Sequence, residues 1–182
     1  RPGIFCRLTR LRILHLGANY LEGLPEEFGN LEALRNASFN NNNLQALPQG
    51  FGKLTALRHL SANKNGLKAL PDSFSELQSL QHLRMEDNHI HKLPQRFGQL
   101  AALRTLYLGN NRLAALPEST KNLRELRVLS VHDNRLRSLP EAILRRLDDR
   151  LEHQLSGNSR LLEMRLHLHK RLVEVKKKLS WC

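Results

Sequence analysis

Histidine is the residue type in this 182-residue chain whose spacing best suits chemistry, and nine histidines are present. His59 and His82 are separated by 23 positions, an interval that recurs throughout the chain. If they occupy equivalent places on neighbouring strands, their imidazoles lie about 5 Å apart and could share a metal ion. The same position of the other units carries no Cys, Asp or Glu that would complete a tetrahedral set. We therefore interpret both histidines as exposed polar residues and expect neither a metal nor another cofactor.

Catalytic chemistry has equally little support. The sequence contains none of the motifs GxGxxG, GxxxxGK(S/T), HExxH or GxSxG. The pair His132-Asp133 has no accompanying nucleophile, so we expect a protein that is not an enzyme. The two cysteines, Cys6 and Cys182, are too few for a disulfide framework. They favour a reducing, cytoplasmic location and leave a nuclear or ciliary one open.

The chain is basic, with 29 Lys and Arg against 17 Asp and Glu and a net charge of +12. Such a field favours acidic protein partners, nucleic acid or anionic membrane surfaces. Aromatic residues make up only 5% of the chain, so the stacking side chains typical of single-strand binding are scarce. This weakens the case for RNA, but the charge alone selects none of these classes. We expect a protein partner, with an acidic protein and a large macromolecular assembly both open. No apolar run reaches the ~18 residues of a membrane span.

The elements that must position these residues follow a strict repeat. Leu-Pro pairs recur with a period of 23, and the third residue after each Pro is Phe in four units, then Thr120 and Ile143. Six units keep this register without insertion, so internal repetition decides the fold. The pairs are Leu24-Pro25, Leu47-Pro48, Leu70-Pro71, Leu93-Pro94, Leu116-Pro117 and Leu139-Pro140.

One unit, residues 103–123, shows the physical logic of the pattern LxxLxLxxNxLxxLPxxFxxL. Leu106 and Leu108 alternate with Thr105 and Tyr107, which predicts a strand with one buried face. Asn111 lies among leucines and, once buried, must hydrogen-bond to backbone groups of a turn. A single unit cannot bury its leucines, whereas stacked units can, with each strand pairing in parallel with the next.

This pattern resembles the leucine-rich repeat, and the LPxxF element is similar to the intracellular Ras-group subclass. The resemblance implies an α/β solenoid with a parallel concave sheet, an irregular or short-helical convex side and a helical C-terminal cap. It covers residues 1–145 as the repeat array, and residues 146–182 are left as a degenerate last repeat with a cap or extension. Ala37, Phe39, Ala62 and Thr120 depart from the family pattern, which should weaken packing locally.

Both ends of the array depart from the repeat. Pro2, Phe5 and Leu8 precede Pro25, Phe28 and Leu31 by one full period, so the chain starts in mid-unit and we expect further sequence upstream of Arg1. A seventh Asn is due at position 157, but Asn158 comes one residue late. The leucine spacing on either side of Asn158 predicts helices that cover the end of the core.

Three sets of side chains are candidates for structural or binding roles. We expect a buried asparagine ladder: Asn19, Asn42, Asn65, Asn88, Asn111 and Asn134. A near-continuous basic edge consists of Arg12, Arg35, Arg58, Arg104 and Arg127. The partner-binding residues of the concave face are His15, Asn36, Ser38, His59, Ser61, His82, Arg84, Glu86, Thr105, Tyr107, Ser130 and His132.

Members of the resembled family mostly bind other proteins, which implies a scaffold or adaptor that binds its partner through the concave face. Two alternatives stay open. The chain could be a structural subunit of a large axonemal or ribonucleoprotein assembly, anchored by its basic charge and C-terminal helix. It could also be the regulatory segment of a larger enzyme whose catalytic part lies outside these residues.

Overall fold

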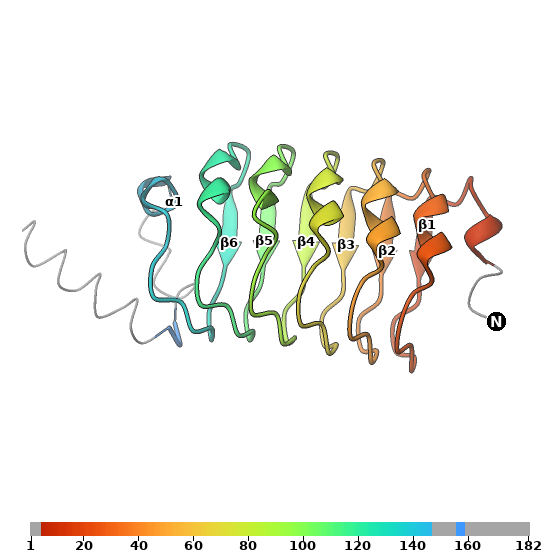
Figure 1. The fold of residues 1–182 in the computed structure, drawn as a ribbon, viewed down its shortest axis with the longest axis horizontal. Coiled ribbons are helices and arrows are strands. Elements are labelled where there is room, and N and C mark those ends of the chain that lie inside the picture. Colours follow the sequence, from red (N-terminus) through yellow and green to blue (C-terminus); the bar gives the residue numbers. More distant parts are fainter. Residues whose placement is uncertain (1–4, 147–155, 159–182) are drawn as a thin grey trace, which may run out of the picture.

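The computed structural model describes residues 5–146 and 156–158 (Figure 1). Each repeat contributes one short strand and one short helical turn. The repeats stack side by side, from the N-terminal unit on the right of Figure 1 to β6 and α1 on the left. The strands are β1 Ile13–His15, β2 Asn36–Ser38, β3 His59–Ser61, β4 His82–Arg84, β5 Thr105–Tyr107 and β6 Val128–Ser130. The 3₁₀ turns are η1 Phe5–Arg7, η2 Glu26–Asn30, η3 Gln49–Lys53, η4 Asp72–Glu76, η5 Phe97–Gln99 and η6 Glu118–Asn122, and one α-helix follows, α1 Glu141–Arg146.

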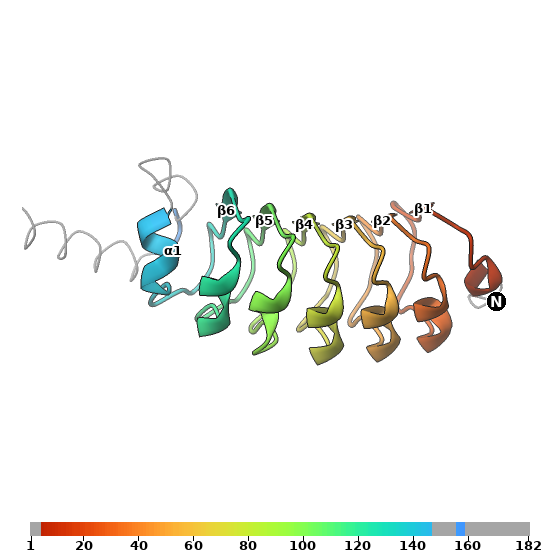
Figure 2. The same ribbon diagram turned by 90° about the horizontal axis from the view of Figure 1, so that it is seen from above.

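The six strands form one parallel sheet in the order β1-β2-β3-β4-β5-β6. Each strand residue pairs with the equivalent residue of the next repeat, as His59 does with His82 and Arg84 with Tyr107. Seen from above, the strands lie on one side of the molecule and the helical turns on the other (Figure 2). The predicted α/β leucine-rich repeat solenoid is therefore confirmed. The predicted cap within residues 146–182 lies almost entirely outside the described residues, as do Arg1, Pro2 and Cys182, and the domain boundary stays a prediction.

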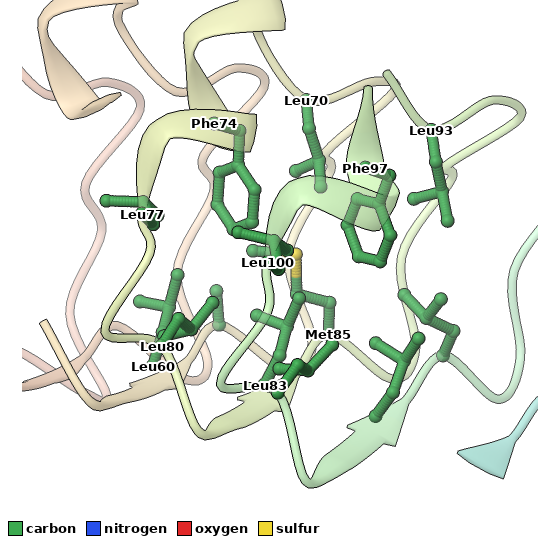
Figure 3. Close-up of a cluster of buried hydrophobic side chains, with 14 of the residues drawn as sticks. Leu60, Leu70, Phe74, Leu77, Leu80, Leu83, Met85, Leu93, Phe97 and Leu100 are labelled. Carbon is green, nitrogen blue, oxygen red and sulfur yellow. The ribbon is translucent and has the colours of Figure 1, made fainter. Parts of the chain in front are cut away.

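The core is a column of leucines and phenylalanines between the sheet and the turns (Figure 3). Phe28, Phe51, Phe74 and Phe97 are fully buried, and neighbouring rings stack with centroids 5.7, 6.0 and 6.4 Å apart. Burial of each such ring contributes on the order of 2–3 kcal/mol. Thr120 takes the next place in this column, where it is buried and its hydroxyl donates to the Pro117 carbonyl at 2.7 Å.

Two departures from the leucine pattern lie at equivalent positions of neighbouring units. Phe39 and Ala62 are both fully buried, and the Phe39 ring packs edge-on against Phe28 with centroids 5.6 Å apart. The large side chain therefore stands beside the small one and partly compensates for the volume missing at Ala62, which is how cores tolerate substitution.

The asparagine ladder lies at the turn that follows each strand. Asn88 donates to the carbonyls of Ala62, Met85 and Glu86, and it accepts the backbone N–H of Leu67 at 3.1 Å. The amide thus joins its own turn to the preceding unit and satisfies backbone groups that are buried with it. Asn42, Asn65, Asn111 and Asn134 are buried in the same way, as predicted.

Asn19 does not follow the prediction, because its side chain is exposed. It donates only to the carbonyls of its own turn, Leu16 and Gly17, since no described unit stacks on its outer side. At the other end, Asn158 is buried and accepts the Leu136 N–H at 3.0 Å while donating to Val131 at 2.8 Å. The late asparagine therefore serves as the seventh member of the ladder.

Candidate functional site: the concave sheet face

The outward-facing side chains of the strands build the candidate site. In each strand the middle residue points into the core, and the two flanking residues point out of the concave face. Because every pair of strands has the same register, equivalent side chains of neighbouring units lie side by side. The concave face is therefore a grid of side chains. The repeating backbone sets the position of each side chain, and the residue type at that position sets its chemistry.

A histidine stack occupies one column of this grid. The rings of His59 and His82 are 4.7 Å apart at their centroids and inclined by 16°. His59 Nδ1 hydrogen-bonds with Asn36 Oδ1 at 3.2 Å, and His82 Nδ1 with Thr105 Oγ1 at 2.9 Å. Burial lowers the pKa of His82, and the positive charges of His59 and Arg104 lower it further. The stack therefore favours the neutral imidazole on His82.

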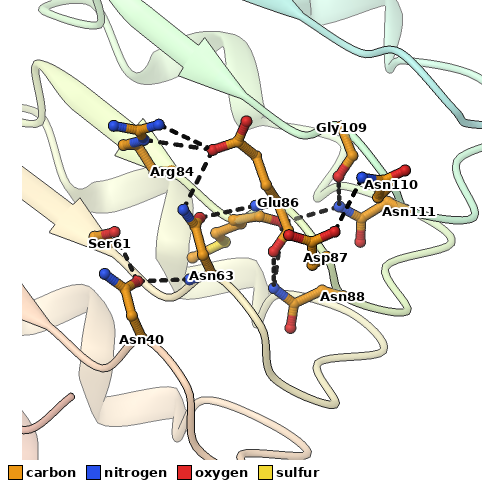
Figure 4. Close-up of polar contacts among 11 residues, drawn as sticks. Asn40, Ser61, Asn63, Arg84, Glu86, Asp87, Asn88, Gly109, Asn110 and Asn111 are labelled. Atoms are coloured by element: carbon orange, nitrogen blue, oxygen red, sulfur yellow. Dashed lines mark hydrogen bonds and ion pairs between the residues drawn. The ribbon is translucent and has the colours of Figure 1, made fainter. Parts of the chain in front are cut away.

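A charged and aromatic cluster lies in the neighbouring column. The Arg84 guanidinium lies 4.9 Å from the centroid of the Tyr107 ring and forms an ion pair with Glu86 at 3.2 Å. Glu86 also accepts from Asn63 Nδ2 at 3.2 Å, and its backbone N–H donates to Asn63 Oδ1 at 2.9 Å (Figure 4). These contacts hold the arginine and the tyrosine in place before any partner binds.

The cluster continues through Asn40 and Asn63, which the sequence places in an outward-facing column of the concave face but which are not among the predicted partner-binding residues. Asn40 Oδ1 accepts from the Ser61 hydroxyl at 2.7 Å and from the Asn63 backbone N–H at 2.8 Å (Figure 4). Asn40 and Asn63 occupy the same position of neighbouring units. That repeated amide was the available signal, and it indicates a second, shallower ladder along the rim of the concave face.

A hollow of about 260 Å³ lies between these features. Its lining contains the small side chains of Ser38 and Ser61 beside the backbone of Ala37, together with His15, His59, His82 and Arg84. Three imidazoles and one guanidinium thus face a space large enough for one or two side chains of a partner. This composition favours a carboxylate or another hydrogen-bond acceptor.

The structure places the predicted concave residues on the sheet face or just beyond the strands, with one difference. Ser130 is only 8% exposed, although its column is predicted to face outward. His132 Nδ1 lies 2.8 Å from Asp133 Oδ2, the turn pair already visible in the sequence. Arg12, Arg35, Arg58, Arg104 and Arg127 are exposed along one edge, as predicted, and Gln81 interrupts the row.

Metal binding and thiol chemistry have no site in the part of the chain that the structure describes. No cluster of three His, Cys, Asp or Glu residues is found within 5–146 and 156–158. Cys6 is buried, and burial together with the nearby Glu27 raises the pKa of its thiol, so the thiolate is disfavoured. Within the same ranges, no helix is both long and apolar enough to cross a membrane.

Family comparisons agree on one repeat type. The model described as "Leucine-rich repeat region" matches residues 3–87, "Leucine rich repeat" matches 65–113, and "Leucine Rich repeats (2 copies)" matches 101–144. Together these matches cover the chain from residue 3 to residue 144. No curated protein sequence matches the chain at a significant level.

Solved structures with the same fold come from bacterial and plant proteins. A leucine-rich repeat protein of Leptospira interrogans is 28% identical with a TM-score of 0.58, over 88% of this chain and 44% of that one. The ectodomain of the Arabidopsis thaliana receptor kinase GASSHO1/SCHENGEN3 was solved in complex with CASPARIAN STRIP INTEGRITY FACTOR 2. It is 33% identical with a TM-score of 0.68, and the match covers 75% of this chain and 17% of that one. The leucine-rich repeat domain of the type III effector XopL is 25% identical with a TM-score of 0.74, over 85% and 56%. The chain thus spans less than two thirds of each of these proteins.

Proposed function

We propose that this chain, which belongs to the leucine-rich repeat proteins, binds a protein partner in the hollow of its concave sheet. Leucine-rich repeat families are in general non-catalytic modules that bind proteins. The observation that supports the concave face is the ordered cluster of Arg84, Tyr107 and Glu86 beside the 260 Å³ hollow. Arginine and tyrosine contribute most to many protein interfaces.

The preorganised contacts give this cluster an energetic advantage. A free arginine or tyrosine loses roughly 0.5–1.5 kcal/mol of side-chain entropy when a partner immobilises it. Here Glu86, which also accepts a hydrogen bond from Asn63, already restricts Arg84, and Arg84 contacts the Tyr107 ring. The similar plant ectodomain that was solved in complex with another factor supports the use of such a solenoid for partner binding.

The chemistry of the hollow supports an acidic residue on the partner. His15, His59, His82 and Arg84 line it, whereas Glu86 stands outside its lining and is paired with Arg84. A carboxylate in the hollow would accept hydrogen bonds from these groups. We extend the proposal to a scaffold or adaptor role without catalysis. The LPxxF motif supports assignment to the intracellular Ras-group subclass. The low cysteine content supports a cytoplasmic location.

Site-specific photocrosslinking tests the proposal and does not require that the partner be identified first. A photoreactive phenylalanine analogue replaces Tyr107 in the full chain, and the control carries it in place of Gln95, which is exposed near η5 on the convex side. Irradiation in an extract of the source cells should give a discrete protein adduct from position 107 and none from position 95. Discrete adducts from position 95 alone would place the binding surface on the convex side and refute the proposal.

A further inference from the structure

A second depression, of about 550 Å³, lies outside the concave face. It is formed by the segments that run from the asparagine ladder to the Leu-Pro pairs in the last three repeats. Its lining is basic and contains no carboxylate among the described residues. The lining residues that matter here are His91, Arg112, Ala114, Arg135, Leu136 and Arg137.

The backbone of these segments sets the spacing of the charges. Arg112 donates its N–H to Ile90 and Arg135 to Leu113, each at 2.9 Å, while Leu113 and Leu136 are buried. Alternation along an extended segment then points Arg112, Arg135 and Arg137 outward, and all three are exposed. Neighbouring segments lie about 5 Å apart, so the three arginine side chains leave the backbone from two adjacent segments and line the same depression.

The positive charge is concentrated at this end of the repeat array. Among the positions equivalent to Arg135 and Arg137 in the first four units, Lys68 is the one permanent cation. Within the described ranges, no carboxylate forms an ion pair with Arg112, Arg135 or Arg137. The depression is therefore a concentrated positive site without a counter-charge from the described part of the chain.

We propose that this depression binds a phosphate group carried by a peptide, independently of the concave face. Guanidinium groups bind phosphate through paired, charge-assisted hydrogen bonds. The three arginines lie on two neighbouring segments about 5 Å apart, so they can surround one phosphate group but not follow a long row of them. No Phe, Tyr or Trp among the described residues lines the depression for base stacking, so a phosphorylated peptide fits better than a nucleic acid.

The test uses the full chain and three probes at fixed ionic strength: a short phosphoserine peptide of otherwise uncharged sequence, its unphosphorylated form, and an oligonucleotide of equal charge. The phosphopeptide should bind at least about tenfold more tightly than the unphosphorylated peptide, since hydrogen bonds to charged groups are strong. The double variant Arg135→Gln with Arg137→Gln should weaken phosphopeptide binding by about ten- to a hundredfold.

Arg96→Gln with Arg124→Gln is the matched control, because it removes the same charge from exposed convex-side positions. It should leave phosphopeptide affinity within about twofold, since only long-range attraction is lost. Melting temperatures of both variants confirm that they fold. Equal weakening by the two variants would overturn the proposal, as would tighter binding of the oligonucleotide than of the phosphopeptide. Crosslinking from position 107 reports on the concave face, so either proposal can fail alone.

Discussion

The imidazole rings of His59 and His82 stack 4.7 Å apart at the centre of the concave face. The two rings come from neighbouring strands and share the wall of one hollow. Protonation of either ring therefore places a positive charge against the other. This relationship links the pH of the solution to the stability of the sheet and to the charge that a partner would meet.

The stack predicts a loss of stability in mild acid. Burial and the charges of His59 and Arg104 lower the pKa of His82 in the folded chain below its ordinary 6.5. The unfolded chain then binds a proton more readily, so the free energy of unfolding falls as the pH decreases below about 6.5. The fall levels off once the pH is below the folded pKa. Chemical unfolding of wild type and His82→Gln from about pH 7.5 to about pH 5 should show a shallower decrease for the variant.

His15→Gln is the control for this experiment, because His15 lies on the same face and is exposed. Its replacement should leave the pH dependence of unfolding as steep as in wild type. If His15→Gln and His82→Gln flattened the profile equally, the stacked pair would not be the cause.

The asparagine ladder gives the second prediction. Asn88→Ala removes the acceptor for the Leu67 N–H and the donor to the Ala62 and Met85 carbonyls, all buried in the turn. Leaving such groups unpaired should lower the free energy of unfolding by roughly 1–3 kcal/mol. Asn19→Ala is the matched control, since Asn19 is exposed and bonds only within its own turn. Urea unfolding should show a much smaller loss for Asn19→Ala, and comparable losses would contradict the role of burial.

The third prediction concerns the close stacking of the helical turns. A Cβ on Gly98 would overlap the backbone carbonyl of Ser119 in the next unit. Gly98→Ala should therefore force the two turns apart and cost about 1–3 kcal/mol of stability. Around Gly23 a Cβ would have no neighbour within 4 Å, so Gly23→Ala should be neutral or stabilising by up to about 1 kcal/mol. Thermal unfolding of the two variants tests this, and a neutral Gly98→Ala would show that the turns can separate freely.

Register and facing could be predicted from the sequence because they depend only on the repeat period. Residues 23 positions apart pair on neighbouring strands, so His59 lies beside His82 and Arg84 beside Tyr107. The alternation within a strand decides which side chains face outward. The same reasoning predicted that Asn88 and Asn111 would be buried. These features follow from the backbone of an average unit.

The features that escaped prediction depend on neighbours rather than on the period. Asn19 is exposed because no described unit stacks on its outer side, and Ser130 is buried although the alternation along its strand predicts an outward side chain. The bonds from Glu86 to Asn63 and Arg84 depend on side-chain rotamers that a repeat pattern does not encode. Asn158 takes its place in the ladder although it comes one residue later than the period requires.

The concave cluster gives the last prediction, on the binding energy itself. Arg84→Ala with Tyr107→Ala removes the guanidinium and the ring that lie 4.9 Å apart in the middle of the sheet. Affinity for the protein captured by crosslinking from position 107 should fall by about 2–4 kcal/mol, as for central Arg and Tyr residues of other interfaces. Stability should change by less than about 1 kcal/mol, because Arg84 is largely exposed and Tyr107 partly so. Isothermal titration and urea unfolding measure the two quantities.

The convex pair Gln95→Ala with Lys121→Ala is the control for the concave pair. Both side chains are exposed, and Lys121 forms a surface ion pair with Glu118 at 3.4 Å, which contributes at most about 1 kcal/mol. This pair should change neither affinity nor stability appreciably. Loss of the partner in the convex pair, with full affinity retained in the concave pair, would move the binding surface to the outer side of the solenoid, since the two pairs lie on opposite faces of the same central and C-terminal repeats.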